Sequence, residues 1–168
     1  MTVQLHAQPY DISAAGFYFD SYDDYAEKAA ALRNDYGDPV EEFEIQFIDG
    51  EAIDCDLVHA IGINQANLKQ FFDAVGDWDD DDKTRVILAV GECGNSFDAD
   101  TQPSEFEVDI YHFDTMRELA VHFVEEGLFG DIPEQLQFYL DYDAIARDLE
   151  HDYSEARVAG QSLIYRCA

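Results

Sequence analysis

An aspartate-rich run in the middle of the chain has the residue type that could bind a hard metal ion. Five of the six residues from Asp77 to Asp82 are aspartates, and calcium binds several oxygen ligands at once. An EF-hand loop beginning at Asp81 would have Glu92 at its twelfth position, but two basic residues would occupy ligand positions and Val86 would stand where the loop requires glycine. The run therefore predicts a solvated acidic loop rather than a calcium site.

Other groupings that support catalysis or metal binding are also incomplete. The five histidines are scattered, and His122 with Glu125 is the nearest approach to a zinc motif, without the second histidine of HExxH. The sequence has no GxSxG, GxxxxGK or GxGxxG motif and no CxxC pair. Carboxylates are so abundant that no glycosidase-like pair can be singled out. We predict no metal, no cofactor and no enzymatic activity; a hydrolase that uses an unrecognised carboxylate pair is a rival hypothesis.

The acidic excess extends along the whole chain. The sequence has 38 Asp and Glu residues against nine Lys and Arg, a net charge of -29. The net charge is -12 over residues 1–62, -7 over residues 63–105 and -10 over residues 106–168. Disordered acidic tails are poor in aromatic residues, whereas this chain is 14% aromatic and 47% hydrophobic, so it should fold. Scattered basic residues also argue against direct nucleic-acid binding, which needs clustered Lys and Arg.

Residues 1–62 predict a small antiparallel sheet that carries one helix. Strands are indicated by alternation in Val3–Ala7, by the aromatic segment Gly16–Phe19, and by Phe43–Phe47 with its acidic outer face. Ser21 can cap a helix whose apolar residues recur at helical spacing as far as Leu32.

Residues 63–105 predict a mainly helical middle unit with a linker. Asn64 can cap a helix that Gly76 ends, and Lys83–Val90 can form a second helix. The segment Gly91–Ser104 is rich in Gly, Asn, Ser, Asp and Pro, which favours a linker.

Residues 106–168 predict a third unit of mixed α and β structure. A strand is expected over Phe106–Ile110, and a capping box at Thr115–Glu118 begins a helix. Asp131 should cap a second helix and Asp141 a third, before a closing strand over Val158–Tyr165. The fold class is therefore α+β, as an elongated chain of three small units.

The number of carboxylates matches the charge of a DNA segment. Duplex DNA carries one charge per ~1.7 Å of axis, so 38 carboxylates equal the phosphates of ~19 base pairs. Neither a signal peptide nor a membrane span of ~20 apolar residues is visible, so we expect a cytoplasmic protein. The candidate phosphate-mimic carboxylates are Asp23, Asp24, Glu41, Glu42, Glu44, Asp79, Asp80, Asp81, Asp82, Glu107, Asp109, Glu118, Glu125, Glu126, Asp131, Glu134, Asp141, Asp143 and Asp148.

The third unit resembles the antirestriction segment of the ArdA family of DNA-mimic proteins. The resemblance extends over residues 106–165, while the N-terminal aromatic segment is similar more loosely. The residues that carry it are Leu128, Phe129, Gly130, Asp131, Ile132, Pro133, Glu134, Leu136, Tyr139, Asp141, Tyr142, Ala146, Arg147, Asp148 and Leu149.

The resemblance implies a homodimer, joined through the third unit, that inhibits type I restriction-modification enzymes. It implies that the protein occupies the DNA-binding groove formed by specificity and modification subunits, and shields incoming DNA of mobile genetic elements. Apolar members of the segment are then expected to build the fold or the dimer contact, and its carboxylates to be mimic charges, although Asp131 and Asp141 could be helix caps only.

Two other hypotheses also explain the charge. Halophilic adaptation favours Asp and Glu over Lys without any particular partner. An acidic binding module, halophile-adapted or not, could instead bind another basic DNA-binding protein.

Overall fold

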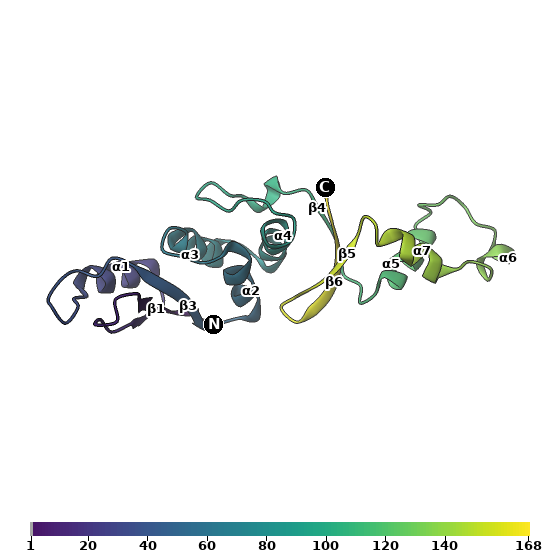
Figure 1. The fold of residues 1–168 in the computed structure, drawn as a ribbon. Coiled ribbons are helices and arrows are strands. Elements are labelled where there is room, and N and C mark those ends of the chain that lie inside the picture. Colours follow the sequence, from purple (N-terminus) through teal and green to yellow (C-terminus); the bar gives the residue numbers. More distant parts are fainter. Residues whose placement is uncertain (1) are drawn as a thin grey trace. The chain divides into compact units, whose positions relative to one another are not determined.

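The computed structural model describes residues 2–168, which form two compact units that meet in sequence between Glu105 and Phe106 (Figure 1). The first unit contains a sheet with a helix, followed by a helical part, and the second contains a sheet with helices. The predicted α+β class is confirmed.

The N-terminal sheet has the strand order β2-β1-β3, with antiparallel pairing throughout. Its strands are β1 (Gln4–Pro9), β2 (Phe17–Phe19) and β3 (Phe43–Asp49). Burial alternates along the strands: Ala7 of β1 is buried opposite Ile45, while Gln8 and its partner Glu44 are exposed. One face of the sheet therefore builds the core and the other carries charge.

An aromatic cluster joins this sheet to two helices of the first unit. Tyr25 of α1 (Tyr22–Ala31) lies 5.0 Å from Phe19 between ring centroids, and Phe17 lies 5.5 Å from Phe43. Phe72 of α3 (Leu68–Asp77) contacts Phe19 at 6.1 Å. These tilted and edge-on contacts are the arrangements that aromatic rings prefer.

The helical part contains one helix that the sequence analysis did not anticipate. This is α2 (Ala52–Ile61), and it packs against α4 (Asp80–Gly91). Between them lies a buried ion pair: Lys83 Nζ is 2.8 Å from Asp54 Oδ1, and the two side chains are 7% and 2% exposed. Among residues 2–168 no partner in hydrogen-bond alignment is found for that oxygen, so the contact is essentially electrostatic.

Two boundaries in this part differ from the prediction. The helix expected to follow Asn64 begins only at Leu68, because the Asn64 side chain accepts the amides of Ala66 and Asn67 in a preceding turn. Gly76 lies within α3 rather than ending it.

The aspartate-rich run is the beginning of α4, which corrects the prediction of a loop. Asp79 is the N-cap and its side chain accepts the amide of Asp82 at 2.8 Å. Asp80, Asp81 and Asp82 occupy the first turn, where the helix dipole stabilises negative charge.

The segment predicted as a linker is folded against the helical part. It ends in the 3-10 helix η1 (Pro103–Glu105), which contacts α4, and both Thr101 and Pro103 are buried.

In the second unit, the sheet has the order β4-β6-β5. Its strands are β4 (Val108–Tyr111), β5 (Ser154–Val158) and β6 (Gln161–Cys167). The predicted single closing strand is in fact a hairpin, because Ala159 and Gly160 both have positive φ, 52° and 78°. Such a pair reverses the chain between antiparallel strands.

Two helices pack together beside this sheet. They are α5 (Met116–Glu125) and α7 (Tyr142–Leu149), with the short α6 (Glu134–Gln137) between them in sequence. The buried core consists of Met116, Leu119, Ala120, Phe123, Ala146, Tyr153 and Ile164.

Candidate functional site

The acidic side chains lie at the surface of both units. Within residues 2–168, Asp54 is the one buried acidic residue. Of the predicted mimic carboxylates, Asp24, Asp82 and Asp109 are partly exposed. The others are exposed: Asp23, Glu41, Glu42, Glu44, Asp79, Asp80, Asp81, Glu107, Glu118, Glu125, Glu126, Asp131, Glu134, Asp141, Asp143 and Asp148.

Three of these carboxylates are partly neutralised by a neighbouring cation. Asp24 lies 2.9 Å from Lys28, and Asp143 lies 3.1 Å from Arg117. Asp109 accepts hydrogen bonds from Arg166, which raise the pKa of that guanidinium. Each of these three carboxylates already has a cation beside it, which reduces the negative charge that it presents at the surface.

Three others bind backbone amides at helix N-termini. Asp79 caps α4, and Asp141 caps α7 by accepting the amide of Ala144 at 3.0 Å. Glu118 accepts the amide of Asp114, while its own amide donates to Thr115, as in the predicted capping box. All three remain exposed, so capping leaves their charge accessible to a partner.

The segment Leu128–Leu149 begins in an open loop and ends in α7. Gly127 and Gly130 have positive φ, 79° and 88°, so Gly127 can end α5 and both glycines permit tight turns in the loop that follows. The prediction that Asp131 caps the next helix is wrong, because α6 begins at Glu134 after Pro133, with no side-chain cap.

Most of the large apolar side chains in the first half of this segment are exposed. Phe138 is 93% exposed and Tyr139 is 83% exposed, and Leu128, Phe129 and Leu136 are also on the surface. In the second half, by contrast, Tyr142, Ala146 and Leu149 pack into the core of the unit. The segment thus combines a structural helix with an uncovered apolar stretch beside carboxylates.

The described residues, 2–168, contain no group of three or more His, Cys, Asp or Glu side chains that could hold a metal ion. His122 lies among aromatic rings, 5.1 Å from Phe113 and 6.2 Å from Tyr111 between ring centroids. No helix in the described part of the chain is long and apolar enough to cross a bilayer.

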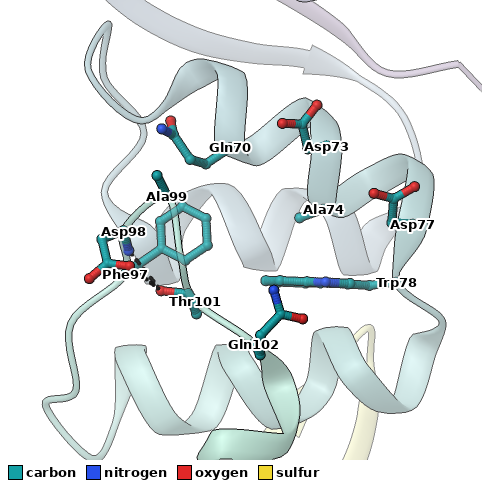
Figure 2. A pocket seen from close by; sticks show the side chains of 10 residues that line it. All are labelled: Gln70, Asp73, Ala74, Asp77, Trp78, Phe97, Asp98, Ala99, Thr101 and Gln102. Carbon is teal, nitrogen blue, oxygen red and sulfur yellow. Dashed lines mark hydrogen bonds between the residues drawn. The ribbon is translucent and has the colours of Figure 1, made fainter.

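Sequence reasoning missed a pocket in the first unit that Trp78 and Phe97 line (Figure 2). The two residues are separated in sequence by the whole of α4. Only the return of the following loop along α3 brings them together, and no sequence pattern signals that contact.

A protein-family model described as Antirestriction protein (ArdA) matches residues 66–160. The match extends from the turn before α3 to the hairpin between β5 and β6, which is more than half of the chain. A search among curated proteins gives no match.

Proposed function

Because the chain belongs to the ArdA antirestriction family, we propose that it inhibits type I restriction-modification enzymes by imitating B-form DNA. Proteins of this family are inhibitors without enzymatic activity. The protein occupies the DNA-binding groove that the specificity and modification subunits form. It thereby protects incoming plasmid, transposon or phage DNA in the cytoplasm, where restriction takes place.

The observation that carries the proposal is the surface charge together with the family match. A net charge of -29 is distributed over two folded units, and within residues 2–168 only one acidic side chain is withdrawn from the surface. Proteins that bind DNA gain affinity from counterion release and association rate from electrostatic steering. A folded polyanion can compete with DNA for the same protein, because its carboxylates provide the same electrostatic attraction.

The folded elements improve this competition. Carboxylates on helices and strands lose less conformational entropy on binding than carboxylates on a flexible acidic tail. Glu44 on β3 and the first-turn aspartates of α4 are examples of charges in fixed positions.

The decisive experiment is cleavage of unmodified plasmid by a purified type I enzyme, titrated with this protein at two salt concentrations. A type II endonuclease is the control. We expect inhibition of the type I enzyme alone, weakening as salt increases. Equal inhibition of both enzymes would indicate a general polyanion effect. Inhibition of neither would favour halophilic adaptation or an acidic module for another basic protein.

A charge-neutralised variant tests whether the surface carboxylates do the inhibiting. The expected result is loss of inhibition without loss of fold, since these side chains are exposed and outside the ion pairs described above. The matched control exchanges Asp and Glu at the same positions and retains the charge. The isosteric amide changes are made at Glu41, Glu42, Glu44, Asp80, Asp81, Glu125, Glu126, Asp131, Glu134 and Asp148.

The proposed active form is a homodimer that assembles through the second unit. The exposed apolar side chains of residues 128–139 support this, because large apolar patches on soluble proteins are usually covered by a partner. Two chains would match the charge of ~38 base pairs, which is the footprint of a large DNA enzyme.

Dimerisation is tested by light scattering of the Phe138→Asp and Tyr139→Asp variants. Both side chains are exposed, so the variants should fold as monomers, whereas Tyr36→Asp, on a loop of the first unit, should leave the dimer intact. A native chain that is monomeric at micromolar concentration would contradict the proposal.

A further inference from the structure

A pocket of about 210 Å³ lies in the first unit between α3 and the loop that follows α4. Figure 2 shows Gln70, Asp73, Ala74 and Asp77 on the helix side. On the loop side it shows Phe97, Asp98, Ala99, Thr101 and Gln102. Trp78, which directly follows α3, forms one wall.

The aromatic side chains are held in place before any ligand arrives. The rings of Trp78 and Phe97 are perpendicular, with 6.3 Å between centroids. The loop is held by a turn in which the Asp98 amide donates to Thr101 Oγ1 at 2.8 Å, and Thr101 is buried. The pocket is thus preorganised, which reduces the entropic cost of binding.

The charge of the pocket is negative. Asp73 and Asp77 are one helical turn apart on α3, and Asp98, from the loop, also lines the pocket (Figure 2). No lysine or arginine of the described chain is among the residues that line it.

Asp73 already binds one exposed cation. Lys69 Nζ is 2.8 Å from its carboxylate, and this hydrogen bond raises the pKa of Lys69. The two side chains are 59% and 60% exposed, so the ion pair is weak. A cation from a partner can therefore replace the lysine.

We propose that this pocket binds the guanidinium group of an arginine side chain. A cation over an indole ring is attracted by the ring quadrupole, and tryptophan is the best of the aromatic residues in this role. The guanidinium is planar, weakly hydrated and carries five N–H donors, which suits stacking on Trp78 together with hydrogen bonds to a carboxylate such as Asp77. An ammonium group stacks less well and keeps its water more strongly.

The source of the arginine is the target enzyme, and this part of the inference rests on the proposed function. Proteins that contact phosphates present arginines for bidentate recognition. One of these side chains would be captured by a shaped pocket in addition to the diffuse attraction of the surface charge.

Trp78 is the chain's single tryptophan, so its fluorescence reports directly on the pocket. The protein is titrated with N-acetyl-arginine amide at constant ionic strength, in parallel with the citrulline and lysine analogues. We expect a saturable change with the arginine compound at millimolar concentration, and at least five-fold weaker binding of the other two. An unsaturable change, or equal binding of all three, would overturn the proposal.

Asp77→Asn is the variant that tests the carboxylate, since Asp77 is exposed and the change is isosteric. It should weaken binding of the arginine compound at least five-fold. Glu27→Gln on α1 makes the same charge change outside the pocket and should leave binding unchanged. If the Asp77→Asn variant bound the arginine compound with native affinity, the guanidinium would not bind at Asp77.

The fluorescence titration needs no restriction enzyme, so the two proposals can fail separately. Plasmid protection without arginine binding would overturn the pocket and leave the proposed function intact. Arginine binding without plasmid protection would support the guanidinium site, but it would contradict the proposal that the arginine comes from a type I restriction enzyme.

Discussion

The buried pair of Asp54 and Lys83 is a residue-scale feature on which stability should depend. Both charged groups are almost fully removed from water, and each is compensated by the other across α2 and α4. In a chain with 38 acidic residues, this lysine is withdrawn from the surface to neutralise one of them. The pair therefore connects the two helices. If either partner is lost, the other charge stays buried without compensation, which destabilises the fold.

Lys83→Met should lower the free energy of unfolding by about 3–5 kcal/mol, because it leaves the Asp54 charge buried without its partner. Urea denaturation at neutral pH measures the loss. Lys69→Met is the matched control: its pair with Asp73 is exposed, and the change should stay within about 1 kcal/mol. Equal effects of the two substitutions would mean that burial of the pair is unimportant.

A second residue-scale contact ties two exposed loops of the first unit together. Asn34 Nδ2 donates to Asp11 Oδ2 at 2.9 Å. This bond, followed by bonds from the amide and hydroxyl of Ser13, lowers the pKa of Asp11 below its ordinary value of 3.8. A lowered folded-state pKa stabilises the fold above pH 3.8, and that contribution disappears as pH falls through the lowered value.

Asn34→Asp should raise the pKa of Asp11 above that of the native chain. The new carboxylate can still accept the amides of Tyr36 and Asp38, but it removes the donor and adds a like charge. NMR titration of the Asp11 carboxyl carbon measures the change. Asn67→Ala, which removes an amide that bonds Ile61 and Gly62, should leave that pKa as it is.

At the scale of the element, two aspartates of similar sequence context have different roles. Asp141 caps α7, while Asp131 precedes α6 and caps nothing. Their surroundings in sequence look alike, since each stands a few residues before an apolar helical stretch. What differs is the position of the helix start relative to the carboxylate.

Asp141→Ala should therefore cost about 1 kcal/mol of stability, whereas Asp131→Ala should leave stability nearly unchanged. Thermal unfolding of the two variants gives the comparison. Both carboxylates are exposed and both changes remove one charge. A loss of inhibition that both variants share would therefore come from the lost charge, whereas a difference in stability between them would come from the lost helix cap. A similar cost for both would contradict the assignment.

At the scale of the whole molecule, the net charge of -29 opposes compactness. Like charges on the surface repel one another, and salt screens this repulsion with a Debye length of about 10 Å at 0.1 M. The same screening weakens binding to a basic groove. Stability and inhibition should therefore respond to salt in opposite directions.

The melting temperature should rise between low salt and about 0.5 M NaCl, because the repulsion is screened. Calorimetry at pH 7 measures the melting temperature. The charge-neutralised variant, in which ten carboxylates are replaced by amides, is the control, and its melting temperature should rise less. A melting temperature that falls with NaCl would show that local ion pairs outweigh the general repulsion.

The sequence by itself determined the fold class, the surface location of most carboxylates and the family. These depend on local properties: the period of apolar residues, helix caps such as Ser21 and Asp141, and the alternation of β3. The motif residues of the second unit also lie in one continuous stretch, and the family match includes them.

The tertiary structure alone decided which acids are structural and which are available. Asp54 gives no sign in the sequence that it is buried against Lys83, and the acidic run looks like a loop until Asp79 is seen to begin α4. Trp78 and Phe97 likewise come together only through the packing of residues far apart in the chain. Phe138 is exposed because no distant part of the described chain covers it. Local patterns do not encode such contacts, because they are selected by packing of whole elements.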